Sequence, residues 1–170
     1  MLELQGFDRQ FSVFRLEADD WPSARELRLR ALAESPEAFL GGMSSEREYD
    51  AKHWRGDLEL NAWFLVGLDG NPVGLAKLNR TAEHNDGMHL EAMWVAPEAR
   101  RRGVGAALVS ALESTATSLG AQLLRLWVFA ENRSAQGFYR RLGYTGPTRT
   151  QKIKVNNQVR IEEEFEKHLG

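Results

Sequence analysis

Short apolar runs alternate with amphipathic stretches along this chain, and this pattern predicts strands and helices in a mixed order. Residues 11–16 are expected to form a first strand. The Asp-Asp-Trp-Pro stretch ending at Pro22 predicts the start of a helix. This helix should end near Ser35, because the residue before a proline is pushed out of the helical region. A second helix is expected over residues 44–55, with Gly56 as its stop.

The second half of the chain carries clearer turn signals. The Asp-Gly-Asn-Pro sequence at residues 69–72 predicts a hairpin turn, and Gly120 and Gly143 mark the ends of two helices. The expected elements are strands at residues 62–68, 73–78, 88–95, 123–129, 148–155 and 158–165, and helices at residues 103–119 and 134–142.

Composition narrows the class of protein. The chain has 170 residues, 42% hydrophobic and 27% charged, so one globular domain over residues 1–170 is expected. Its net charge of −2 argues against nucleic acid or an anionic membrane as a partner. Cysteine is absent, which excludes disulfides and a cysteine nucleophile. No membrane span, signal peptide or metal-ligand spacing of histidines is recognisable, so we expect a cytoplasmic protein without a metal.

The stretch from residue 95 to residue 108 passes from a strand through a basic loop into a helix. The start of a helix exposes unpaired N–H groups and the positive end of the helix dipole, which attract anions. Gly103 and Gly105 have no side chain to keep a phosphate away from these groups. The loop also carries three consecutive cations, Arg100, Arg101 and Arg102. These features suit a pyrophosphate, although a glycine-rich turn with solvated arginines would give the same pattern.

Two nucleotide fingerprints are absent from this loop. It lacks the Gly-Lys-Ser/Thr of a P-loop, and Leu108 stands where a dinucleotide fingerprint requires its third glycine. The remaining Arg-x-x-Gly-x-Gly string resembles the R/Q-x-x-G-x-G/A signature of the GNAT superfamily of N-acetyltransferases. The resemblance implies that acetyl-CoA is the cosubstrate and that its pyrophosphate lies against residues 100–106, including Val104 and Ala106.

A second block supports the same resemblance. Residues 132–144 are similar to the family's N-x-x-A-x-x-x-Y-x-x-x-G-F/Y sequence, which also follows a buried strand. The chain is therefore identified as a small, bacterial-type member of the superfamily. This implies an α/β (α+β) fold, with a mixed, mostly antiparallel central sheet and helices on both faces. The strands at residues 88–95 and 123–129 would form a parallel pair, joined by a crossover helix and splayed at the acetyl-CoA site.

The resemblance also assigns residues to the cosubstrate. The pantetheine arm is expected to lie along the strand that ends at Met93, Trp94 and Val95, and to pair with its backbone. The N–H at or near Val95 would polarise the thioester carbonyl. Asn132 and Ser134 would contact the cosubstrate beyond the neighbouring strand, although both residues also suit a simple helix cap.

Tyr139 is the candidate general acid. A phenol titrates near ~10, so it stays protonated at neutral pH and can donate to the departing thiolate. The alternative is that Tyr139 is a core aromatic residue, like its neighbour Phe138.

Glu91 is the candidate base for the acceptor's proton, directly or through water. It lies in a largely apolar strand, where half-buried surroundings raise the pKa of a carboxylate. Strand alternation puts it on one face with Met93 and Val95. The alternative is a solvent-facing Glu91 paired with Lys77 across the sheet. His89 is a second candidate base on the same face.

The acceptor is expected to be a primary amine, on a small molecule or a peptide. The resemblance implies a pocket formed by the first two helices, their connecting loop and the last hairpin, with Phe39, Trp54, Trp63 and residues 148–151 as candidate lining. Phe39 and Trp54 are also typical core residues, and the sequence favours that role for them. The three glutamates at residues 162–164 could attract a cationic amine, although a charge run on a terminal strand is usually solvated. The sequence does not identify the amine or the acyl-chain preference, and it leaves a homodimer as one option.

The leading function is therefore acetyl-CoA-dependent N-acetyl transfer by direct attack in a ternary complex. The absence of cysteine excludes a cysteine acyl-enzyme. The alternative is a non-catalytic acyl-CoA-binding or regulatory module of the same fold. A third reading, nucleic-acid binding through residues 100–102, conflicts with the acidic overall balance.

Overall fold

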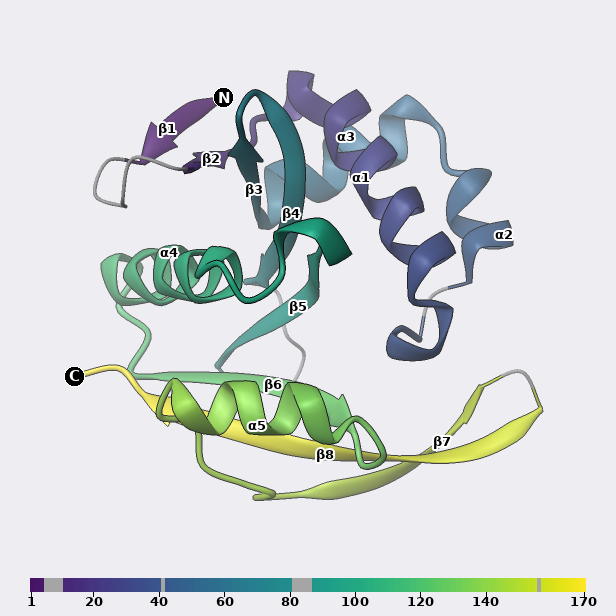
Figure 1. Ribbon diagram of the computed structural model, residues 1–170, viewed down its shortest axis with the longest axis vertical. Helices are drawn as coiled ribbons and strands as arrows, with labels where there is room; N and C mark the ends of the chain where they lie inside the picture. Colours follow the sequence, from purple (N-terminus) through teal and green to yellow (C-terminus); the bar gives the residue numbers. More distant parts are fainter. Residues whose placement is uncertain (5–10, 41, 81–86, 156) are drawn as a thin grey trace.

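A computed structural model describes residues 1–4, 11–40, 42–80, 87–155 and 157–170 (Figure 1). The chain forms an eight-stranded sheet with the strand order β1-β2-β3-β4-β5-β6-β8-β7. The strands are β1 (Leu2–Leu4), β2 (Phe11–Arg15), β3 (Ala62–Leu68), β4 (Asn71–Asn79), β5 (Met88–Val95), β6 (Leu123–Phe129), β7 (Thr150–Val155) and β8 (Gln158–His168). The helices are α1 (Trp21–Glu34), α2 (Met43–Arg47), α3 (Ala51–Leu60), α4 (Val104–Ser118) and α5 (Arg133–Arg141).

One pair of strands differs from all others in the sheet. β5 and β6 run parallel, whereas the remaining neighbours are antiparallel. The two strands are joined by α4 as a crossover helix, as predicted. Their pairing is short, because Met88 faces Leu124 and His89 faces Arg125 with no further register partner among the described residues. The two strands therefore separate at their carboxyl ends, and the expected mixed fold is confirmed.

Helices cover both faces of the sheet. A Cβ added to Gly74 of β4 would meet Val104 and Leu108 of α4 at 3.1 Å, so this face lies against α4. The next residue, Leu75, pairs with Trp94, whose indole donates to Glu34 of α1 at 2.9 Å. Because neighbouring residues of a strand point to opposite faces, α1 and α4 pack on opposite sides of the sheet.

The predicted helix over residues 44–55 is wrong in one respect. The structure has two helices there, α2 and α3, separated by a turn. Asp50 causes the break, because its carboxylate accepts the backbone N–H of His53 at 2.8 Å and caps a new helix. Gly56, expected as a stop, lies inside α3, where a Cβ would meet nothing within 4 Å. A solvent-facing helical position tolerates glycine at a cost of about 1 kcal/mol, so Gly56 did not end the helix.

The other predicted elements are found within a few residues of their expected ends. In the hairpin turn, Asp69 and Gly70 have φ angles of 50° and 79°. Gly120 and Gly143, which follow the ends of α4 and α5, have φ angles of 85° and 90°. β1 was not predicted. A polar loop is also expected at residues 84–87, and of these only Gly87 lies within the described residues. No described helix is long and apolar enough to cross a membrane.

Candidate functional site

A β-bulge in β5 decides which side chains face the candidate site. Ala92 has a φ angle of 53°, and the pairing with β4 shifts from Lys77–Glu91 to Leu75–Trp94. Glu91 and Trp94 therefore share a face, although simple alternation would separate them. Met93 points to the other side, where its methyl carbon lies 3.4 Å from the Cβ position of Gly105. The prediction that Glu91 shares a face with Met93 and Val95 is wrong.

The side chain of Glu91 is held by two partners. Its Oε2 lies 2.9 Å from the ammonium of Lys77, and its Oε1 accepts from Asn79 Nδ2 at 2.8 Å. The cross-strand contact with Lys77 is the one that the sequence offered as an alternative to a catalytic role. Glu91 is nevertheless 39% exposed, and it lines a cavity.

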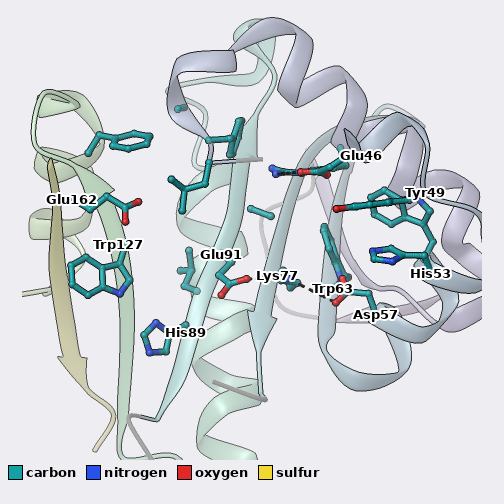
Figure 2. A pocket seen from close by; sticks show the side chains of 18 of the residues that line it. Glu46, Tyr49, His53, Asp57, Trp63, Lys77, His89, Glu91, Trp127 and Glu162 are labelled. Carbon is teal, nitrogen blue, oxygen red and sulfur yellow. Dashed lines mark hydrogen bonds and ion pairs between the residues drawn. The ribbon is translucent and has the colours of Figure 1, made fainter. Parts of the chain in front are cut away.

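This cavity, of about 440 Å³, lies between the splayed strands and the helices α1 to α3. Its wall is rich in aromatic rings, contributed by Phe39, Tyr49, Trp54, Trp63, Trp127 and Phe129. Phe39, Trp54, Trp63 and Gln151, all candidates from the sequence, are among the lining residues; residues 148–150 are not. In Figure 2, Trp127 and Glu162 reach in from one side, while Tyr49, His53 and Asp57 lie on the opposite side, with Glu91 between the two groups.

Glu162 also lines the cavity, although the sequence favoured a solvated glutamate run over a contact with a cationic amine. It is only 4% exposed, so the expectation of a solvated glutamate run is wrong. The reason is its register: β8 lies between β6 and β7, and Glu162 pairs with Phe129 on one side and Gln151 on the other. The amide of Gln151 donates to Glu162 Oε2 at 2.8 Å. Burial raises the pKa of Glu162, against smaller opposite effects of Gln151 and the Arg160 charge.

Glu164, two residues along the same strand, is buried in a different way. It is 1% exposed, but both of its oxygens accept from Arg149, at 2.8 and 2.6 Å, and Thr148 donates a further bond. Burial acts to raise the pKa of Glu164, yet these hydrogen bonds and the Arg149 charge together bring it below the ordinary value. Two glutamates on one face of one strand thus have opposite electrostatic surroundings.

The basic loop before α4 has the backbone of an anion site. Arg101 and Gly103 have φ angles of 61° and 84°, and Gly103 is the residue preceding the helix. The N–H groups of the first helical turn, at Val104, Gly105 and Ala106, precede the first intrahelical bond, from Ala107 N to Gly103 O at 3.0 Å.

The two glycines of this loop are required for different reasons. Gly103 needs its left-handed φ angle, while a Cβ there would have room. Gly105 has an ordinary conformation, but a Cβ there would lie 3.1 Å from the ring of Phe138 in α5. Gly105 therefore permits the close packing of α5 on the start of α4, which is a reason the sequence did not reveal.

The arginines of the loop do not share one role. Arg100 donates to the carbonyl of Val95 at 2.9 Å and to the carboxylate of Glu34 at 2.7 Å. Hydrogen bonds from Ser35 and Trp94, with the charge and hydrogen bond of Arg100, lower the pKa of Glu34. Arg100 thus ties the loop to β5 and α1. Arg101 and Arg102 are exposed beside the helix start.

The second sequence block forms α5 and the turn before it. The side chain of Asn132 accepts from Ala135 N at 3.1 Å, so it caps the helix, and Ser134 is exposed. Tyr139 is 6% exposed and packs edge-on against Phe138 and Tyr144, with ring centroids 5.1 and 5.7 Å away. Burial raises the pKa of Tyr139, so its phenol is protonated at neutral pH.

Known proteins are similar to this chain in sequence or in fold. A family model described as the acetyltransferase (GNAT) family matches residues 15–144. An uncharacterised N-acetyltransferase from Methanocaldococcus jannaschii is 24% identical over 147 residues, a match that covers 84% of this chain and 64% of that protein. YncA from Salmonella typhimurium, solved with its cofactor acetyl-CoA, has a similar fold, with a TM-score of 0.76, 15% identity and 94% of both chains covered. A GNAT-family acetyltransferase from Streptococcus pneumoniae gives 0.75 and 16% identity, with 95% of this chain and 100% of that chain covered.

Proposed function

Because the chain belongs to the acetyltransferase (GNAT) family, we propose that it transfers the acetyl group of acetyl-CoA to a primary amine. One observation carries the proposal. From Leu90 to Val95, the edge of β5 that faces β6 has no strand partner within the described residues. An extended pantetheine arm can pair with such an edge as an added strand would. The thioester would then lie beside the cavity that contains Glu91 and Glu162.

The start of α4 supports the proposed donor site. A pyrophosphate fits there because the first-turn N–H groups of a 15-residue helix are combined with the exposed guanidinium groups of Arg101 and Arg102. Gly103 keeps the approach open, since nothing lies closer than 3.9 Å to its Cβ position. In this proposal Arg100 shapes the loop through Val95 and Glu34, and Asn132 shapes the start of α5.

The proposed reaction is direct attack of a neutral amine on the thioester in a ternary complex. The amine nitrogen forms a bond to the acetyl carbon, and the bond from that carbon to sulfur breaks. Tyr139 is the proposed donor of a proton to the leaving thiolate, and it regains a proton from the nitrogen that becomes an amide. Glu91 lines the cavity, whereas Tyr139 is not among its lining residues. Glu91 must give up the contact with Lys77 or Asn79 before it can bind an acceptor's proton through that oxygen.

Two measurements test the proposal. Calorimetry should detect saturable acetyl-CoA binding, and thiol release from acetyl-CoA should accelerate with at least one member of a panel of amines. Gly103→Asp should weaken acetyl-CoA binding at least about ten-fold, through bulk and charge beside the phosphates. Gly70→Asp is the matched control, because Gly70 has a similar φ angle of 79° in the β3–β4 turn. Equal affinity of the folded Gly103→Asp variant would refute the donor site, and binding without turnover of any amine would favour a non-catalytic module.

A further inference from the structure

Glu162 differs from the other carboxylates that line the cavity. Glu46 is paired with Arg28 at 2.7 Å, and Glu91 is paired with Lys77 at 2.9 Å. Asp57 accepts bonds from the indole of Trp63 and from Asn61, and it lies 3.9 Å from Lys77. Each of these groups thus has a cation or several donors to hold its charge.

Glu162, by contrast, forms no ion pair with any described residue, and the Arg160 charge offsets only part of the effect of its burial. Among the described residues, its one hydrogen bond comes from the neutral amide of Gln151, to Oε2 at 2.8 Å. The cation on its own strand, Arg160, is instead paired with Glu131 at 2.6 Å and donates to the carbonyl of Glu37 at 2.8 Å. Oε1 of Glu162 remains available to a ligand.

Burying a carboxylate without a cation is costly unless something else compensates for it. Glu162 is 4% exposed, yet it reaches into the cavity beside the ring of Trp127 (Figure 2). A positively charged ligand would supply the missing counter-charge. Aromatic rings favour a cation over an anion. The Phe129 ring already has Arg160 at 3.3 Å, whereas the nearest guanidinium over the Trp127 ring, that of Arg149, lies 5.9 Å from its centre. The surroundings of Glu162 therefore suit an ammonium group.

We propose that Glu162 receives the acceptor: its carboxylate binds the incoming ammonium group beside Trp127 and takes up its proton before the amine attacks the thioester. This inference rests on the proposed acetyl transfer. An alkylammonium ion and the Glu162 carboxylate become a neutral amine and a carboxylic acid, and no oxidant or further reactant is needed. After the product leaves, Glu162 returns its proton to water. The Lys77–Glu91 pair then has a positioning role in the same cavity.

Other titratable groups also face Glu162 across the cavity. They are His89 and Glu91 on β5, Lys77 on β4, His53 and Asp57 on α3, Tyr49 before α3, and the pair Arg28–Glu46. On its own strand β8, the charged neighbours of Glu162 on the same face are Arg160, paired with Glu131, and Glu164, paired with Arg149. Burial also raises the pKa of Glu162. A carboxylate with a raised pKa is better suited to accept and return a proton near neutral pH.

The test compares Glu162→Gln with Glu91→Gln, two changes that remove one charge each and keep the shape of the side chain. For an amine that the wild-type protein acetylates, Glu162→Gln should lower kcat/KM at least about ten-fold and abolish the acid limb of its pH profile. Acetyl-CoA affinity should not change. Glu91→Gln should keep the acid limb. An acid limb that survives in Glu162→Gln, or disappears only in Glu91→Gln, overturns the proposal.

A second measurement does not depend on turnover. Calorimetry with n-butylammonium at neutral pH should give binding to the wild-type protein that is at least about ten-fold weaker in Glu162→Gln. Equal affinity in the two proteins, or no binding to the wild-type protein, contradicts the role of Glu162. Failure of all amines to be acetylated would count against the proposed function, while this binding difference would still decide the inference.

Discussion

The ammonium of Lys77 on β4 lies 2.9 Å from Oε2 of Glu91, its cross-strand partner on β5. The contact joins Lys77 and Glu91, the last register pair of β4 and β5 before the bulge at Ala92. Lys77 also lies 5.5 Å from the centre of the Trp63 ring. The pair thus joins two strands and an aromatic side chain at one wall of the cavity.

A double-mutant cycle should detect this pair. Glu91 is 39% exposed, so solvent screens the attraction, and we expect a coupling of about 0.5–1 kcal/mol in the free energy of unfolding. The measurement is urea unfolding of the wild-type protein, Lys77→Met, Glu91→Gln and the double variant. Strictly additive changes would show that the contact does not contribute to stability.

The contact between Gly105 and Phe138 gives a second prediction. Alanine favours a helix over glycine by about 1 kcal/mol, but a Cβ at position 105 would lie 3.1 Å from the Phe138 ring. The change in the free energy of unfolding caused by Gly105→Ala should therefore be about 1 kcal/mol more stabilising in a Phe138→Leu background than in the wild-type protein. Chemical unfolding of the four proteins measures this difference.

Gly103→Ala serves as the comparison for that cycle. Gly103 has a φ angle of 84°, so alanine should cost about 1–2 kcal/mol through backbone strain. The nearest atoms to its Cβ position belong to Phe11, at 3.9 Å, so Phe138→Leu should leave this cost unchanged. Coupling of Phe138 to position 103 rather than to position 105 would contradict the packing described for α5.

Local sequence signals predicted most of the sheet and both motif-bearing helices. Turn residues and apolar periodicity are local properties, and the pairing of β5 with β6 follows from a crossover helix. The division of α2 from α3 was missed because a capping Asp50 is hard to distinguish from an ordinary exposed aspartate. The left-handed Ala92 was also missed, since alanine carries no signal for a positive φ angle.

The candidate site was predictable only in part. The loop before α4 and Tyr139 are found at the places that the motifs indicated, but the use of Arg100 as a tie to Glu34 depends on contacts between distant segments. The burial of Glu162 depends on β8 lying between β6 and β7. A run of three glutamates looks solvated in isolation, and only the strand order shows that alternate members face a covered side of the sheet.

Tyr139→Phe should lower kcat at least about ten-fold and leave acetyl-CoA affinity unchanged. Burial raises the pKa of Tyr139 above its ordinary value near ~10, so its acidic form persists to higher pH than a free phenol. Wild-type kcat should consequently show no loss attributable to Tyr139 below pH ~10. Steady-state kinetics across the alkaline range provide the check, with Phe138→Leu as the control for packing. An unchanged kcat in Tyr139→Phe removes this residue from the mechanism.

Glu162→Gln and Glu164→Gln should have opposite effects on stability at pH 7. The folded-state pKa of Glu162 is raised, so its contribution favours the fold at low pH and is lost as pH rises. Glu162→Gln should therefore be neutral or stabilising by up to about 1 kcal/mol at pH 7. The pKa of Glu164 is lowered, so its contribution is present at pH 7 and is lost on acidification.

Removing the Glu164 charge should accordingly destabilise the protein by about 1–2 kcal/mol at pH 7, because Arg149 loses its partner. The difference from the wild-type protein should shrink as pH falls below ~4.3, the ordinary pKa of glutamate, toward the lowered pKa of Glu164. Thermal unfolding between pH ~3 and pH ~8 measures both variants. A loss of stability in Glu162→Gln as large as that in Glu164→Gln would mean that the charge of Glu162 is compensated within the protein.

Transfer of a labelled acetyl group tests the central claim most directly. Acetyl-CoA carrying a labelled carbonyl carbon would be incubated with the protein and a panel of primary amines, and the carbon signal followed by NMR. The account predicts that the signal moves from the thioester to an amide with at least one amine, and that Tyr139→Phe slows this movement. A signal that stays in the thioester with every amine, in a protein that binds acetyl-CoA, would contradict it.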